Sequence, residues 1–173
     1  MDDKVHSIVN IDDLPLAKSE KGARFAAETG EIGMALGLRG LGAMLHQVPP
    51  GKTAFPFHRH HVSDEMFFIL SGTGTYRIGD GTKEQKLQVG PGDCLGAPAG
   101  GIAHQIINTG DEPLRYIGFS NNTNADVVEH LDSGRIRIDV GANGYHYADG
   151  TFKAGLKPVF MDYWDGEDIG EQE

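Results

Sequence analysis

Apolar residues occur along this chain in short runs, and glycine, proline, asparagine or aspartate bounds most of them. Each run has the length of one strand, and no convincing amphipathic helix occurs before residue 125. Many short strands without intervening helices are typical of a β-sandwich or a β-barrel. We therefore expect an all-β barrel whose strands include residues 32–38, 41–48, 66–70, 75–78, 87–89, 102–107 and 114–119.

The two ends of the chain differ in pattern from its middle. We expect residues 1–20 to form an N-terminal arm, residues 21–122 to form the barrel, and residues 123–173 to be a C-terminal extension that packs on it. Gly79, Asp80 and Gly81 separate two apolar runs, which predicts a tight hairpin turn. Residues 66–70 are apolar on both faces, so one face is expected to meet a second sheet or subunit.

The C-terminal extension carries weaker patterns. Residues 126–131 are helix-like, and residues 135–140 alternate like an edge strand. The apolar residues near the end are candidates for anchoring the tail to the barrel: Val159, Phe160, Tyr163 and Trp164. Six carboxylates and no lysine or arginine lie within residues 161–173, and we interpret this acidic end as a solvated terminus.

Charge and cysteine content exclude several classes of function. The 173 residues carry a formal net charge of −10 with a pI near 5.2, which argues against binding to nucleic acid or to an anionic membrane. Cys94 is the only cysteine, and we interpret it as a small buried hydrophobe rather than a nucleophile. No apolar run is long enough to span a membrane and the first ten residues lack a secretory pattern, so a cytoplasmic location is expected.

A cluster of histidines precedes one of the apolar runs. His58 and His60 are two residues apart, so in a strand their side chains point to the same face, whereas His61 points to the other. Glu65 shares its face with Phe67 and would therefore enter the apolar interior. A buried carboxylate costs several kcal/mol unless a cation or hydrogen bonds compensate it. A metal ion held by these histidines and Glu65 would remove that cost.

A second segment supplies a fourth candidate ligand. His104 lies in the predicted strand of residues 102–107, where it shares a face with Ile102 and Ile106. The segments HRHHVSDEMFFILSG and GDCLGAPAGGIAHQIIN resemble, in this order, the first and second motifs of the cupin superfamily. The second motif resembles that of a group of small bacterial cupins provisionally labelled as sugar-phosphate isomerases. The two motifs and their spacer cover residues 51–108.

Two spacings depart from the cupin pattern. Six residues separate Gly51 from His58, where the pattern has five. One residue more than usual separates Pro98 from His104, so either Gly100 or Gly101 is the turn glycine.

The resemblance implies a single jelly-roll barrel that frequently forms a homodimer. It also implies one divalent ion bound by His58, His60, Glu65 and His104. Three neutral imidazoles and one carboxylate leave such an ion with a net charge near +1 and open positions for a ligand. The donor set suits zinc, manganese, iron, nickel or cobalt and does not choose among them.

Other residues are expected near this cavity. The candidates for its wall or for a second layer around the metal are Phe67, Tyr76, Ile102, Gln105 and His61. His46 could approach from another strand, whereas His130 has no partner at a useful spacing. No catalytic base can be assigned from the sequence.

Three classes of function remain open. The leading hypothesis is a metal-dependent enzyme acting on a small polar metabolite, with an isomerase of sugar phosphates or related compounds favoured. An iron or manganese oxygenase (dioxygenase) or a decarboxylase would use the same ligands. A non-catalytic sensor or small-molecule binding module is the third reading.

Overall fold

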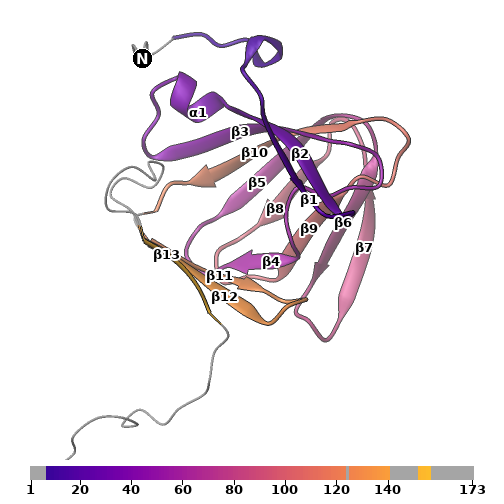
Figure 1. Ribbon diagram of the computed structural model, residues 1–173, viewed down its shortest axis with the longest axis vertical. Helices are drawn as coiled ribbons and strands as arrows, with labels where there is room; N and C mark the ends of the chain where they lie inside the picture. Colours follow the sequence, from indigo (N-terminus) through magenta and orange to yellow (C-terminus); the bar gives the residue numbers. More distant parts are fainter. Residues whose placement is uncertain (1–6, 124, 141–151, 157–173) are drawn as a thin grey trace, which may run out of the picture.

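The computed structural model describes residues 7–123, 125–140 and 152–156, and nearly all of their regular structure is β-strand (Figure 1). All pairs between these strands are antiparallel. The elements are, in chain order, η1 (Ile11–Asp13), β1 (Ala17–Lys21), β2 (Phe25–Glu31), α1 (Ile32–Ala35), β3 (Leu41–Val48), β4 (His58–His60), β5 (Glu65–Ser71), β6 (Gly74–Gly79), β7 (Glu84–Val89), β8 (Cys94–Ala97), β9 (Ala103–Ile107), β10 (Leu114–Asn121), β11 (Ala125–His130), β12 (Arg135–Val140) and β13 (Phe152–Leu156).

The strands form two sheets that enclose a common interior (Figure 1). The six-stranded sheet has the order β1-β2-β3-β10-β5-β8, and the seven-stranded sheet has the order β13-β12-β11-β4-β9-β6-β7. Strands distant in sequence are therefore neighbours, as β4 is of both β9 and β11. The predicted all-β jelly-roll barrel is confirmed.

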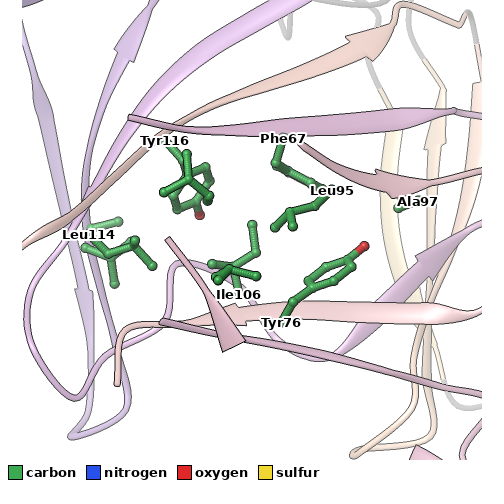
Figure 2. Packing of buried hydrophobic residues seen from close by; sticks show 11 residues of the cluster. Phe67, Tyr76, Leu95, Ala97, Ile106, Leu114 and Tyr116 are labelled. Carbon is green, nitrogen blue, oxygen red and sulfur yellow. The ribbon is translucent and has the colours of Figure 1, made fainter. Parts of the chain in front are cut away.

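The main core lies between the two sheets. Phe67 and Tyr116 extend inward from the six-stranded sheet and meet Tyr76 and Ile106 from the other sheet (Figure 2). Leu114 is fully buried beside them. Because side chains alternate along each strand, this core takes every second residue of β5, β6, β9 and β10.

The two faces of β5 differ in exposure. Phe67 and Ile69 point inward and are buried, whereas Met66 and Phe68 point outward and are 46% and 37% exposed. Cys94 pairs with Phe68 and is exposed, so its interpretation as a buried hydrophobe is wrong. One face of residues 66–70 thus meets the second sheet, and the expected homodimer stays a prediction.

The predicted hairpin turn joins β6 to β7. Gly81 has a φ of 90°, which favours glycine, and Asp80 Oδ1 accepts hydrogen bonds from the backbone N–H groups of Thr82 and Lys83 at 2.8 Å. The carboxylate holds the loop closed, and these hydrogen bonds lower the pKa of Asp80 to about 2.

Two segments differ from their expected conformation. Residues 126–131 were expected to be helix-like, but Ala125–His130 form strand β11 because both β4 and β12 pair with them. The expected strand of residues 32–38 instead contains the single helical turn α1, followed by Gly37 with a φ of 69°. All but the last residue of β1 lies within the expected N-terminal arm, and the predicted domain bounds stay a prediction. The proposed tail anchors and the acidic end lie outside the described residues.

Replacing Tyr76 with Phe tests one polar contact of the core. The Tyr76 hydroxyl donates a hydrogen bond of 2.9 Å to the carbonyl oxygen of Gly96. We expect Tyr76→Phe to lower the free energy of unfolding by about 1 kcal/mol, measured by urea denaturation of metal-free protein. Tyr116→Phe is the control, since the Tyr116 hydroxyl donates no hydrogen bond within the described chain; an equal loss in both variants would contradict the assignment.

Candidate metal centre

Four polar side chains converge at one end of the interior from both sheets. β4 presents His58 and His60 on the same face, and β9 pairs with β4 so that His104 lies directly opposite His58. Glu65 begins β5 in the other sheet and reaches the histidines across the interior. The fold thus brings together the four residues that the motifs predicted, and they come from the three strands β4, β5 and β9.

His58, His60 and Glu65 are close enough to share one ion, and His104 approaches the same carboxylate oxygen. Glu65 Oε2 lies 3.1 Å from His104 Nε2, 3.3 Å from His60 Nε2 and 3.9 Å from His58 Nε2. One ligand atom from each of His58, His60 and Glu65 lies within 4.8 Å of the others. Ligands held about 2.0–2.2 Å from one ion are themselves roughly 3–4 Å apart, so these separations suit a common metal.

Unpaired buried atoms provide an independent test of that fit. Among the described residues, Glu65 Oε2 has no hydrogen-bond partner, and neither ring nitrogen of His104 has one. The short distance between Glu65 Oε2 and His104 Nε2 is therefore a contact without hydrogen-bond geometry. Leaving such groups buried and unpaired costs about 1–3 kcal/mol each, more for charged groups, and a bound cation would compensate both atoms.

Two of the histidines are oriented by hydrogen-bond partners of their Nδ1 atoms, on the side of the ring away from Glu65. His58 Nδ1 lies 2.7 Å from the carbonyl oxygen of Pro56, which can only accept, so Nδ1 carries the proton. His60 Nδ1 donates to Asp126 Oδ2 at 2.6 Å, and Asp126 Oδ1 accepts from the backbone N–H of Val62 at 3.0 Å. Both contacts direct Nε2 toward Glu65, as second-layer partners of metal-binding histidines do.

Burial and neighbouring charges shift the titration of these groups. Burial lowers the pKa of His58 to about 3, so this imidazole is neutral at pH 7. Burial alone would raise the pKa of Glu65, but the three histidines outweigh it and the pKa is lowered. Burial would lower the pKa of His60, yet Asp126 and Glu65 raise it. His58 and Glu65 are therefore already in the protonation states that bind metal.

A cavity of about 180 Å³ opens beside the four side chains. A cavity needs a volume of at least about 10–15 Å³ to hold one water, so this cavity has room for several waters or a small metabolite. Phe67, Ile106 and the aromatic ring of Tyr116 form part of its apolar wall. The polar residues of its lining are His46, His58, His60, Glu65, His104, Gln105, Tyr116, Ser120, His130 and Arg137.

The structure places the other expected residues differently. Phe67 and Gln105 line the cavity, and the side-chain amide of Gln105 donates to the carbonyl oxygen of Phe55 at 2.9 Å. Tyr76 is buried in the core behind it. Ile102 does not line it, because β9 begins only at Ala103 and the alternation that was expected to turn Ile102 inward does not extend to it. His61 also lies outside it and contacts Glu129 at 3.1 Å.

Four polar residues of the site were missed or left without a role. Asp126 and His130 belong to β11, and Arg137 to β12, which pairs with β11. His46 on β3 stacks on Tyr116 with ring centroids 4.6 Å apart, and burial lowers its pKa to about 4. The alternation of Asp126, Val128 and His130 was the only sequence signal that could have indicated the inward face of β11.

Comparisons with known proteins agree with this architecture. Residues 44–120 match a family model described as the cupin domain, whereas no curated protein matches the chain. A structure from Acidithiobacillus ferrooxidans, provisionally assigned as a sugar phosphate isomerase, is 27% identical with a TM-score of 0.65 and covers 79% of this chain and 82% of its own.

Two further structures show the fold at lower identity. A sugar phosphate isomerase of the cupin superfamily from Silicibacter pomeroyi is 22% identical with a TM-score of 0.70, covering 90% of this chain and 98% of its own. A predicted oxalate decarboxylase from Thermotoga maritima is 19% identical with a TM-score of 0.56, covering 66% and 97%. In the described part of the chain, no helix has the length and apolar character needed to cross a membrane. The match over residues 44–120, the two motifs and the shared barrel together show a cupin domain within this chain.

Proposed function

We propose that this cupin is a metal-dependent enzyme that acts on a small polar metabolite, and that His58, His60, Glu65 and His104 hold its single divalent ion. The observation that carries the proposal is the position of Glu65 Oε2, which is buried, has no hydrogen-bond partner among the described residues and faces three imidazole nitrogens within 3.9 Å. A carboxylate and three imidazoles in this arrangement are a donor set for a divalent transition metal.

The chain's own residues prepare the site for a ligand. Asp126 and the carbonyl of Pro56 hold His60 and His58 in fixed orientations, which lowers the entropy lost on binding. Phe67, Ile106 and Tyr116 exclude water from one side of the cavity. A bound divalent ion would supply Lewis-acid polarisation of a carbonyl or hydroxyl oxygen.

We favour an isomerase of sugar phosphates or similar hydroxy-carbonyl compounds. Such a reaction needs a polarised carbonyl, which the proposed metal in the partly apolar cavity would provide. It needs no external oxidant. The 27% identical structure assigned to this class supports the choice. Oxygenase, decarboxylase and non-catalytic binding activities would use the same four residues and are therefore outcomes of the test.

The test measures turnover in the absence and presence of oxygen. Chain purified without added metal is analysed for its elements, reloaded with that metal, and given aldose and ketose phosphates under anaerobic conditions. Interconversion without oxygen is the expected result. Strict oxygen consumption would identify an oxygenase, release of carbon dioxide a decarboxylase, and tight binding without turnover a binding module; each of these would overturn the isomerase assignment.

Metal affinity is expected to fall between pH 7 and pH 5. In the metal-free chain Asp126 and Glu65 raise the pKa of His60 above its ordinary value, so a proton competes with the ion for this imidazole as the pH falls below neutral. His58, with a pKa of about 3, and Glu65, with a lowered pKa, stay deprotonated in this range. One displaced proton predicts a decrease approaching about tenfold per pH unit. Chelator competition at several pH values measures it, and a flat affinity would contradict the prediction.

A further inference from the structure

The inner face of β12 continues the row of side chains that begins at the proposed metal ligands. His60 on β4 pairs with Val128 on β11, and Val128 pairs with Arg137 on β12. Directly paired residues of neighbouring antiparallel strands project to the same face of a sheet. Arg137 therefore faces the same interior as His60 and lies two strands away from it.

Arg137 gives the cavity a positive end. Of the described residues that line the cavity, Arg137 is the only lysine or arginine, and Glu65 is the only carboxylate. Glu65 belongs to the proposed metal centre, where its charge would be compensated by the ion. Glu65 is thus the only carboxylate of the described cavity lining that could oppose the charge of Arg137, and the proposed metal ion would already compensate it.

The guanidinium of Arg137 is only partly used by the residues that the structure describes. Arg137 Nη2 contacts Asp139 Oδ2 at 2.9 Å on the same strand. Within the described part of the chain, Arg137 Nε is buried without a hydrogen-bond partner, and so is Asp139 Oδ1. The pair is therefore joined at one point, whereas a guanidinium and a carboxylate can form two parallel hydrogen bonds. A donor of Arg137 remains available to a ligand.

His130 provides a second unused nitrogen in the same wall. It pairs with His58 across β11 and β4, and their ring centroids are 6.1 Å apart. His130 lines the cavity, and its Nε2 is buried without a hydrogen-bond partner among the described residues. Because no described residue satisfies either this nitrogen or Arg137 Nε, a ligand or water at this position would remove the cost of leaving them buried and unpaired.

We propose that Arg137, with His130 beside it, forms an oxyanion-binding subsite, so that the metabolite bound in this cavity carries a phosphate or carboxylate group. The inference rests on the proposed function, because it places the anionic group of the ligand at Arg137 and its reacting carbonyl or hydroxyl end at the metal centre. A planar guanidinium suits both anions, since it can donate two parallel hydrogen bonds to either. The subsite then fixes the direction in which the ligand enters.

The test uses two simple anions as probes. ¹⁵N-labelled full-length chain without metal is titrated with sodium phosphate and, separately, with sodium acetate at constant ionic strength, and shifts of the β11 and β12 amides give the dissociation constants. We expect one anion to bind at these strands. Arg137→Gln should lower the affinity for this anion at least about tenfold, the loss typical of a charge-assisted hydrogen bond. Stronger binding of phosphate assigns a phosphorylated ligand, and stronger binding of acetate a carboxylate ligand.

Arg135 supplies a matched control. It lies two residues away on β12, is exposed, and does not belong to the cavity lining. Arg135 pairs with His130, so Arg135→Gln removes a charge next to the subsite but outside the cavity lining, and it is expected to weaken anion binding less than Arg137→Gln because exposed charges are screened by salt. Equal losses in both variants, or no loss in Arg137→Gln, would overturn the subsite.

A third variant and a second measurement keep the outcome interpretable. If Arg137→Gln does not fold, Arg137→Lys keeps the charge but cannot form the two-point contact, and several-fold weaker binding is expected; unchanged binding again overturns the subsite. The metal content of Arg137→Gln should equal that of the wild type. Unchanged anion binding in Arg137→Gln, in a chain that still takes up metal, refutes the subsite alone, whereas anion binding through Arg137 in a chain that takes up no metal refutes the proposed metal centre alone.

Discussion

Glu65→Gln should reduce bound metal from about one ion per chain to background. Glutamine preserves the size of the side chain but removes its negative charge, and one neutral oxygen is a much weaker ligand for a divalent ion. The variant should also lose the rise in melting temperature that metal gives the wild type, because an ion that binds only the folded chain stabilises it. Elemental analysis and thermal unfolding with and without metal measure both effects.

Glu31 is the matched control for this substitution. Its Oε2 is also buried without a hydrogen-bond partner among the described residues, and burial raises the pKa of its carboxyl group. Glu31 does not line the cavity. Glu31→Gln should therefore keep both the metal and the metal-dependent rise in melting temperature. Full metal content in Glu65→Gln would contradict the role of Glu65, and loss of metal in both variants would indicate a general structural effect.

Asp126→Asn should weaken metal binding by about 10- to 100-fold while leaving a site that can still be saturated. The Asp126 carboxylate accepts the Nδ1 proton of His60 at 2.6 Å, and its hydrogen bonds outweigh burial and lower its pKa to about 2. An amide at this position can still accept one hydrogen bond, but it no longer makes the imidazole more electron-rich or secures its orientation. Competition with a chromophoric chelator measures the affinity.

Asp132 supplies the comparison for Asp126. It pairs with Arg77 at 2.8 Å, and neither residue belongs to the cavity lining. Asp132→Asn removes an equivalent charge and should leave the metal affinity within about twofold, since surface pairs contribute little. An Asp126→Asn variant that binds metal as tightly as Asp132→Asn would show that His60 needs no partner to act as a ligand.

Local patterns were sufficient to predict the four converging residues. The two-residue spacing of His58 and His60 places both on one face, and Glu65 and His104 share inward faces with Phe67 and Ile106, respectively. The barrel follows from the short apolar runs and their glycine-rich turns, such as Asp80–Gly81. These features depend on residues close together in the sequence.

The missed parts of the site depend on pairing between distant strands. β11 is defined by its neighbours: Val128 pairs with His60 on β4, and Glu129 on the opposite face contacts Arg59 at 2.7 Å. Its six residues alone carry too short a pattern to distinguish a strand from a helix turn. The roles of Asp126, His130 and Arg137 could therefore not be predicted. The prediction that Ile102 lines the cavity was wrong for a different reason. It extended the strand alternation one residue before the start of β9 at Ala103.

These placements also separate two contributions to ligand binding. The proposed metal ligands come from β4, β5 and β9, whereas the proposed anion subsite comes from β11 and β12. Substitutions in the first group should change metal content, and substitutions in the second should change ligand affinity at constant metal content. The C-terminal strands would then select the ligand while the motif residues hold the ion.

Anomalous X-ray diffraction from crystals of the metal-loaded chain tests the metal centre most directly. Data collected on both sides of the absorption edge of the metal should show one strong peak about 2.0–2.2 Å from His58 Nε2, His60 Nε2, His104 Nε2 and a Glu65 carboxylate oxygen. A cavity without such a peak at full loading, or a peak held only by carboxylates on the surface, would contradict the account.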